Sequence, residues 1–122
     1  MAKEKEVERI NPVLIKDPET GEEKYKLEFN RKTIKNAERN GFKLNDVLDY
    51  PMGKTVELFY WSLQMHHKGM TMDKAEVLFD EIGGMAQEGL IKRLFELYNE
   101  PFRALQGDED TEKNGKKYVV DM

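Results

Sequence analysis

The chain has 122 residues, of which 39% are hydrophobic and 36% are charged. This length predicts one domain with a hydrophobic core of its own and leaves no room for two. The net charge of −4 argues against a general attraction to nucleic acid, although a local basic patch remains compatible with it. The sequence contains no cysteine, no signal peptide and no uninterrupted apolar run of about 18 residues, so we expect neither disulfides nor a membrane span.

Two segments near the N-terminus have the composition of β-strands. Residues 1–10 alternate basic and acidic side chains, and we expect them to be flexible. Residues 12–16 are apolar in their centre, and residues 24–29 alternate between apolar and charged side chains. The turn between them begins with Asp-Pro and ends at Gly21, which favours a type I turn. We predict a β-hairpin over residues 12–29 whose apolar face packs on helices, because an isolated hairpin is marginally stable in water.

Helical periodicity replaces strand alternation from Asn30 onward. Asn30, Asn45 and Thr71 are suited to cap helix N-termini, and a glycine follows several of the apolar runs. Pro101 should kink or restart the last helix. The predicted helices cover residues 31–40, 46–50, 53–68, 72–82 and 85–105.

These elements predict an α+β fold in which the hairpin packs on four or five helices. The single domain is expected over residues 11–106, followed by a flexible acidic tail over residues 107–122. Within the shorter helices, the side chains expected to point inward are Val47, Leu48, Val77, Leu78 and Ile82.

The segment Val56 to Met65, with the sequence VELFYWSLQM, is apolar on nearly all sides when drawn as a helix. Such a helix must be covered from several directions, by its own domain or by another chain. The aromatic and methionine-rich surroundings therefore favour a domain that binds a protein partner.

Candidate catalytic and metal-binding residues have weak support. His66 and His67 are adjacent and point about 100° apart on a helix, so we expect a structural or solvated role for both. Residues 110–121 partly match a calcium-binding loop, but Glu112 and Asp121 depart from the required residues at positions three and twelve. Ser62 is the only serine, and no histidine can be placed beside it by sequence. We expect a protein that is not an enzyme and that needs no cofactor or metal.

A local cluster of basic residues allows two interpretations of its function. It comprises Arg31, Lys32, Lys35, Arg39 and Lys43. A nucleic-acid-binding regulator would use such residues against phosphates. We favour the other interpretation, the solvated face of an amphipathic helix, because the chain as a whole is acidic.

Four methionines lie around two predicted helix ends: Met65, Met70, Met72 and Met85. Their thioether side chains could form an adaptable binding surface or fill gaps in a small core. The sequence favours neither interpretation over the other.

The run from Tyr25 to Phe42, with the sequence YKLEFNRKTIKNAERNGF, resembles the tail assembly chaperones of long-tailed bacteriophages and of prophages of Gram-positive bacteria. In that family a strand leads into a helix of similar pattern, followed by a short segment near a proline, an aromatic-rich helix and a helical C-terminal half. The resemblance covers about residues 12–105.

The resemblance implies a non-enzymatic chaperone that binds the tape-measure protein and helps tail tube protein to assemble around it. It also implies action in the host bacterial cytoplasm, absence from the mature virion and a capacity to form homo-oligomers. The alternatives are a small nucleic-acid-binding regulator that uses residues 31–43 and a structural connector of the virion. The residues expected to divide between core and partner surface are Phe59, Trp61, Met65, Met70, Met72, Leu94, Tyr98 and Phe102.

Overall fold

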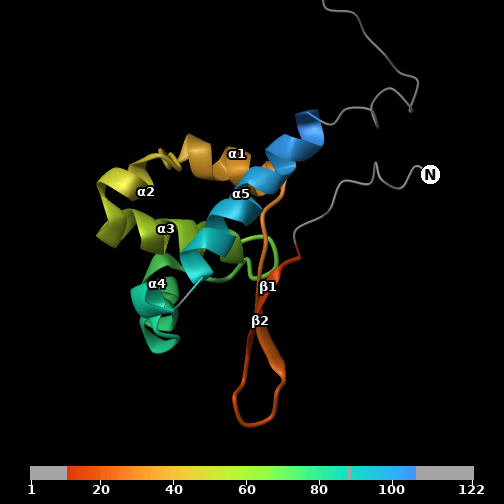
Figure 1. Cartoon of the computed structure of the whole chain (residues 1–122), viewed down its shortest axis with the longest axis vertical. Coiled ribbons are helices and arrows are strands. Elements are labelled where there is room, and N and C mark those ends of the chain that lie inside the picture. Colours follow the sequence, from red (N-terminus) through yellow and green to blue (C-terminus); the bar gives the residue numbers. More distant parts are fainter. Residues whose placement is uncertain (1–10, 88, 107–122) are drawn as a thin grey trace, which may run out of the picture.

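The computed structural model describes residues 11–87 and 89–106, and it confirms the predicted α+β fold (Figure 1). In this part of the chain a two-stranded hairpin is followed by five α-helices and one 3₁₀ turn. The elements are β1 (Val13–Lys16), β2 (Glu23–Leu27), α1 (Arg31–Arg39), α2 (Asp46–Asp49), α3 (Pro51–Leu63), α4 (Met72–Glu81), η2 (Gly84–Ala86) and α5 (Leu90–Gln106). The terminal segments 1–10 and 107–122, with the candidate calcium loop, lie outside the described residues.

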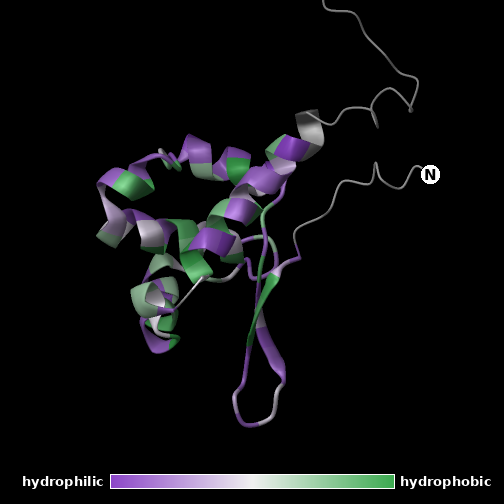
Figure 2. Cartoon of the chain, in the orientation of Figure 1, coloured by the Kyte–Doolittle hydropathy of each residue, from purple (hydrophilic) through white to green (hydrophobic). Residues whose placement is uncertain are grey.

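The predicted hairpin is confirmed, with strands slightly shorter than expected. β1 and β2 pair antiparallel, with Val13 opposite Leu27 and an irregularity after Ile15. In the turn, the carboxylate of Asp17 accepts a hydrogen bond of 2.8 Å from the backbone N–H of Glu19, and its pKa is lowered mainly by such backbone bonds. Hydrophobic residues lie near the base of the hairpin and hydrophilic ones toward its far end (Figure 2). Only the base therefore packs on the helices.

Helix α1 begins and ends where the sequence signals predict. The side chain of Asn30 accepts hydrogen bonds from the N–H of Thr33 at 2.8 Å and from its hydroxyl at 2.7 Å, which caps the helix. Ile34 and Ala37 are buried on one face. Gly41 follows at φ 87°, a conformation that a side chain would disfavour. These signals set the direction in which the chain leaves α1.

Helix α3 is the centre of the core. It contacts β2, α1, α2, α4 and α5, which confirms that its many apolar residues are covered from several directions. Leu58, Phe59 and Leu63 are fully buried. Ser62 is also fully buried, and its hydroxyl donates to the backbone carbonyl of Phe59 at 2.6 Å. That bond satisfies a polar group that would otherwise be costly inside the core.

The limits of α3 differ from the prediction of residues 53–68. The helix starts at Pro51, because a proline in the first helical position loses no hydrogen bond. It ends at Leu63, after which the chain forms turns and the N–H of His67 donates to the carbonyl of Leu63 at 2.8 Å. The last predicted turn is replaced by contacts to the hairpin.

Two predictions about α2 are wrong. Asn45 makes no side-chain cap bond, since it already has the helical conformation and α2 has only four residues. Leu48 is 74% exposed, while Val47 is buried. Adjacent residues on a helix point in directions about 100° apart, and so short a helix buries only one of them.

One prediction about α4 is wrong for the same reason, the angle between adjacent residues on a helix. Thr71 caps this helix as predicted, accepting a bond from the N–H of Lys74 at 3.2 Å. Leu78 is buried and Ile82 is half-buried, but Val77 is exposed on the opposite side. The face of α4 that meets α3 is narrower than the apolar pattern indicated.

The last helix is interrupted where one continuous helix was predicted over residues 85–105. Gly83, Gly84 and Gly89 all have positive φ, and the chain forms η2 before α5 begins at Leu90. Helix α5 continues through Pro101 without restarting. Among the described helices, none combines the length and the apolar character needed to cross a membrane.

Candidate functional site

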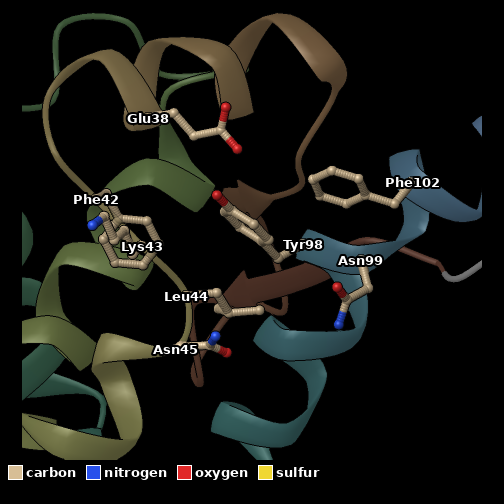
Figure 3. Close-up of a pocket in the computed structure, with 8 residues that line it drawn as sticks. All are labelled: Glu38, Phe42, Lys43, Leu44, Asn45, Tyr98, Asn99 and Phe102. Carbon is tan, nitrogen blue, oxygen red and sulfur yellow. The ribbon is translucent and has the colours of Figure 1, made fainter.

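An apolar hollow lies between the link from α1 to α2 and the C-terminal half of α5 (Figure 3). Its volume is about 600 Å³, and we call it the α5 groove. The residues that line it are Glu38, Phe42, Lys43, Leu44, Asn45, Tyr98, Asn99 and Phe102. The link residues Phe42 and Leu44 are brought to α5 because Gly41 turns the chain at the end of α1.

Aromatic rings in edge-to-face and tilted contacts form the floor of the α5 groove. The ring of Tyr98 lies 5.0 Å from that of Phe29 and 5.8 Å from that of Phe42, measured between centroids. Phe102 follows one helical turn later, with its centroid 6.1 Å from that of Tyr98. Phe102 is 39% exposed, whereas Tyr98 is buried. The groove thus presents an aromatic surface that continues into the core.

Polar groups surround this floor. The hydroxyl of Tyr98 points toward Glu38 (Figure 3). Burial, with a smaller contribution from the charge of Glu38, raises the pKa of Tyr98 to about 12. The phenol is therefore neutral at physiological pH, and Lys43 and Asn99 complete a polar rim. An apolar floor with a polar rim suits recognition of an amphipathic protein segment.

The structure divides the eight predicted partner residues between core and surface. Phe59, Leu94 and Tyr98 are buried and form the core part of that division. The ring of Phe59 packs on that of Phe79 on α4, whereas Tyr98 is buried but still lines the floor of the α5 groove. Trp61, Met65 and Met70 are half-buried, and Met72 and Phe102 are exposed.

The two exposed members do not share one surface. Phe102 lies in the α5 groove, while Met72 stands at the start of α4. Met70 lines a separate hollow of about 380 Å³, together with Tyr25 and Val77. Of the methionine cluster, Met72 and Met85 are exposed and Met65 and Met70 are half-buried, so none of the four is buried in the core, although Met70 packs against it.

An exposed apolar corner between α2 and α3 was missed by the sequence reasoning. Leu48, Tyr50 and Met52 are 74%, 65% and 84% exposed. The sequence contained an indication of this exposure, because three apolar residues at a spacing of two cannot all lie on one face of a helix. We call these three residues the α2–α3 corner.

The two histidines join the end of α3 to the hairpin. The Nε2 of His67 accepts a hydrogen bond of 3.0 Å from the backbone N–H of Lys26, and its ring packs on Tyr25 with centroids 5.3 Å apart. The Nε2 of His66 lies 2.8 Å from the carboxylate of Glu28. Of the two roles expected for these residues, structural or solvated, the contacts to the hairpin give both a structural one, although His66 is also exposed.

His67 makes the stability of the fold depend on pH. Burial, followed by the charge of His66, lowers its pKa below the usual value of 6.5. The unfolded chain then binds more protons than the folded chain as pH falls below about 6.5, so this contribution to stability is present above that pH and is lost below it. We expect His67→Gln, which keeps an acceptor but does not titrate, to lose less stability than the wild type between pH 7 and pH 5. Urea unfolding at both pH values measures this, and equal losses would contradict it.

The basic cluster forms a solvated face of α1 and the following link. All five of its cations are exposed, while Ile34 and Ala37 on the same helix are buried. Where the structure describes the chain, histidine and acidic residues do not gather into a group of three that could hold a metal ion.

Fold and surface together define a small α+β domain in which a hairpin and four helices enclose the central helix α3. The chain belongs to the family described as Domain of unknown function (DUF5055), whose model matches residues 1–121. Comparisons with curated proteins and with solved structures gave no match.

Proposed function

We propose that the protein is a non-enzymatic tail assembly chaperone that binds the tape-measure protein of a long-tailed phage and assists assembly of the tail tube. The observation that carries this proposal is the α5 groove, in which Phe102 is exposed beside a buried aromatic floor. The resemblance of residues 25–42 to phage tail assembly chaperones supplies the identity of the partner.

The mechanism follows from the shape and chemistry of the α5 groove. An apolar stripe of a client helix would cover Phe102 and Leu44, and polar residues of the client would meet Lys43 and Asn99 at the rim. One groove of this size provides a weak contact. Several chaperone molecules along a very long client gain avidity without tight single sites, and each covers an apolar segment that would otherwise aggregate.

The exposed α2–α3 corner also supports a role in binding protein. Its three large apolar side chains lie within five residues of the sequence and are all exposed, and grouped exposed apolar side chains mark surfaces that bind protein. We propose that the corner adds a second apolar contact to the same client, or joins neighbouring chaperone copies along it.

Affinity capture from cells in which the phage or prophage is replicating tests this function. We expect the tagged wild type to retain a very long helical tail protein, identified by mass spectrometry. Phe102→Asp should lower its recovery by about tenfold or more, because a charge would replace the exposed ring in the groove. Lys92→Asp is the matched control, since this exposed residue lies on the same helix and does not line the groove.

Three results would overturn the proposal. Equal recovery with Phe102→Asp would remove the α5 groove from the mechanism. Retained DNA whose binding falls steeply with salt would favour a regulator that uses Arg31, Lys35 and Arg39. Presence of the protein in finished particles would favour a structural connector.

A further inference from the structure

The hairpin has one edge that is covered and one that is open. On the β2 side, the N–H of Lys26 donates to His67, and the N–H of Glu28 donates to the carbonyl of Ser62 at 2.9 Å. Leu14 stands directly opposite Lys26 in the antiparallel pair. In an antiparallel pair, two directly opposite residues either both hydrogen-bond to each other or both point their N–H and C=O groups outward. Because the N–H of Lys26 points away from β1, the N–H and C=O of Leu14 point away from β2. β1 therefore offers an unpaired donor and acceptor at its outer edge.

This open edge faces a groove rather than a flat surface. The groove has a volume of about 630 Å³, and we call it the β1-edge groove. The residues that line it are Val13, Leu14, Ile15, Lys16, Pro18, Glu81, Ile82, Gln87, Gly89, Leu90 and Arg93. The β1-edge groove therefore runs along the outer edge of β1, with the apolar residues of β1 on one side and Ile82 and Leu90 on the other.

Charged residues stand at both ends of the β1-edge groove, with Arg93 at one end and Glu81 and Lys16 at the other. Arg93 marks the end where β1 begins, because its guanidinium donates to the backbone carbonyl of Asn11. Glu81 marks the other end, since it also lines the hollow beside Tyr25, the partner of Ile15. An extended segment that fits this slot needs an apolar centre, an acidic residue near Arg93 and a basic residue near Glu81.

We propose that residues 118–120 of the same chain bind in the β1-edge groove as a third strand, antiparallel to β1. Tyr118, Val119 and Val120 are residues that favour strands. With Val120 opposite Leu14, the backbone of Val120 pairs with the open N–H and C=O of Leu14. Val119 then lies beside Ile15 on the face that meets Ile82.

The same register satisfies both charged ends. Residues 117, 119 and 121 share one face of the added strand, because side chains alternate along it. Asp121 comes to lie beside Val13, at the end of the groove marked by Arg93. Lys117 comes to lie opposite Asp17, at the end marked by Glu81. A parallel strand would reverse these pairings and place like charges together.

The connecting residues are long enough for this arrangement. From Arg93, at the groove, helix α5 runs about 20 Å to Gln106 at a rise of 1.5 Å per residue. The intervening residues 107–117 span up to about 36 Å when extended. They therefore reach back along α5 to β1, and an attached segment binds at a high effective concentration.

Amide hydrogen exchange of the full chain, followed by NMR, tests the added strand. We expect the N–H of Leu14 to be protected in the native chain and to exchange about tenfold faster in Val120→Pro, which removes the donor to Leu14. The N–H of Ile15 faces β2 and should be unchanged, which reports an intact hairpin. Asn114→Pro is the control variant, since it places a proline in the connecting residues and should leave Leu14 protected.

Two further measurements show whether the strand that protects Leu14 belongs to the same chain. Protection of Leu14 should not change on dilution, and a synthetic peptide of residues 115–122 should restore it in Val120→Pro. Equal exchange of Leu14 in the native chain and in Val120→Pro would overturn the proposal. Protection that disappears on dilution would also overturn it and would assign the open edge to a second copy of the chain.

Discussion

Replacing Phe59 by alanine is expected to lower the free energy of unfolding by about 3–5 kcal/mol. Phe59 is fully buried on α3, and its ring lies 5.1 Å from that of Phe79 on α4. The substitution removes this contact and leaves a cavity where the central helix meets its neighbour. Such a loss is a large part of the total stability of a small domain. Urea unfolding followed by the fluorescence of Trp61 measures the change.

Met52→Ala is the matched control for this prediction. Met52 lies in the first turn of the same helix but is among the most exposed apolar residues, so its truncation should change stability by less than about 0.5 kcal/mol. A cost below about 1 kcal/mol for Phe59→Ala would mean that α3 is not the centre of the core. The pair separates loss of packing from any general effect of shortening a side chain on α3.

Replacing Gly84 by alanine should cost about 2–4 kcal/mol, because two unfavourable effects combine. Gly84 has φ +41°, a conformation that side chains disfavour. An added Cβ would also lie 3.0 Å from the ring of Phe79 and 3.1 Å from its carbonyl oxygen. The turn at η2 would have to open, which would shift the start of α5. Thermal unfolding and the circular dichroism of the variant test this.

Gly53→Ala is the control, and its expected effect on stability has the opposite sign. Gly53 lies in the first turn of α3, and an added Cβ would meet nothing within 4 Å. Alanine there should raise stability by about 0.5–1 kcal/mol, since it reduces the backbone freedom of the unfolded chain. Destabilisation by Gly53→Ala, or tolerance of Gly84→Ala, would contradict the described backbone.

The two proposals use different parts of the molecule and fail independently. The chaperone proposal depends on Phe102 and the α5 groove, at the C-terminal half of α5. The added strand depends on the open edge of β1, at the N-terminal end of α5. Val120→Pro leaves the α5 groove intact, and Phe102→Asp leaves the edge of β1 intact. Client capture with Val120→Pro would show whether the strand also controls access to a partner.

Several features followed from the sequence by itself, because short-range chemistry determines them. The caps at Asn30 and Thr71 need only a side-chain oxygen and the next few backbone N–H groups. The turns at Gly21 and Gly41 need positive φ, which glycine adopts at little cost. Strand alternation in residues 24–29 placed the hairpin for a similarly local reason.

Tertiary structure alone decided which apolar residues are buried. Val47 and Leu48 are equally apolar neighbours, yet only Val47 faces the core, because the position of α3 selects one direction out of two. Tyr98 and Phe102 lie one turn apart on α5, but only Tyr98 is covered, by Phe29 and Phe42. Burial depends on neighbours that are distant in sequence, and local pattern carries no information about them. The division between core and binding surface could therefore be read only from the packed fold.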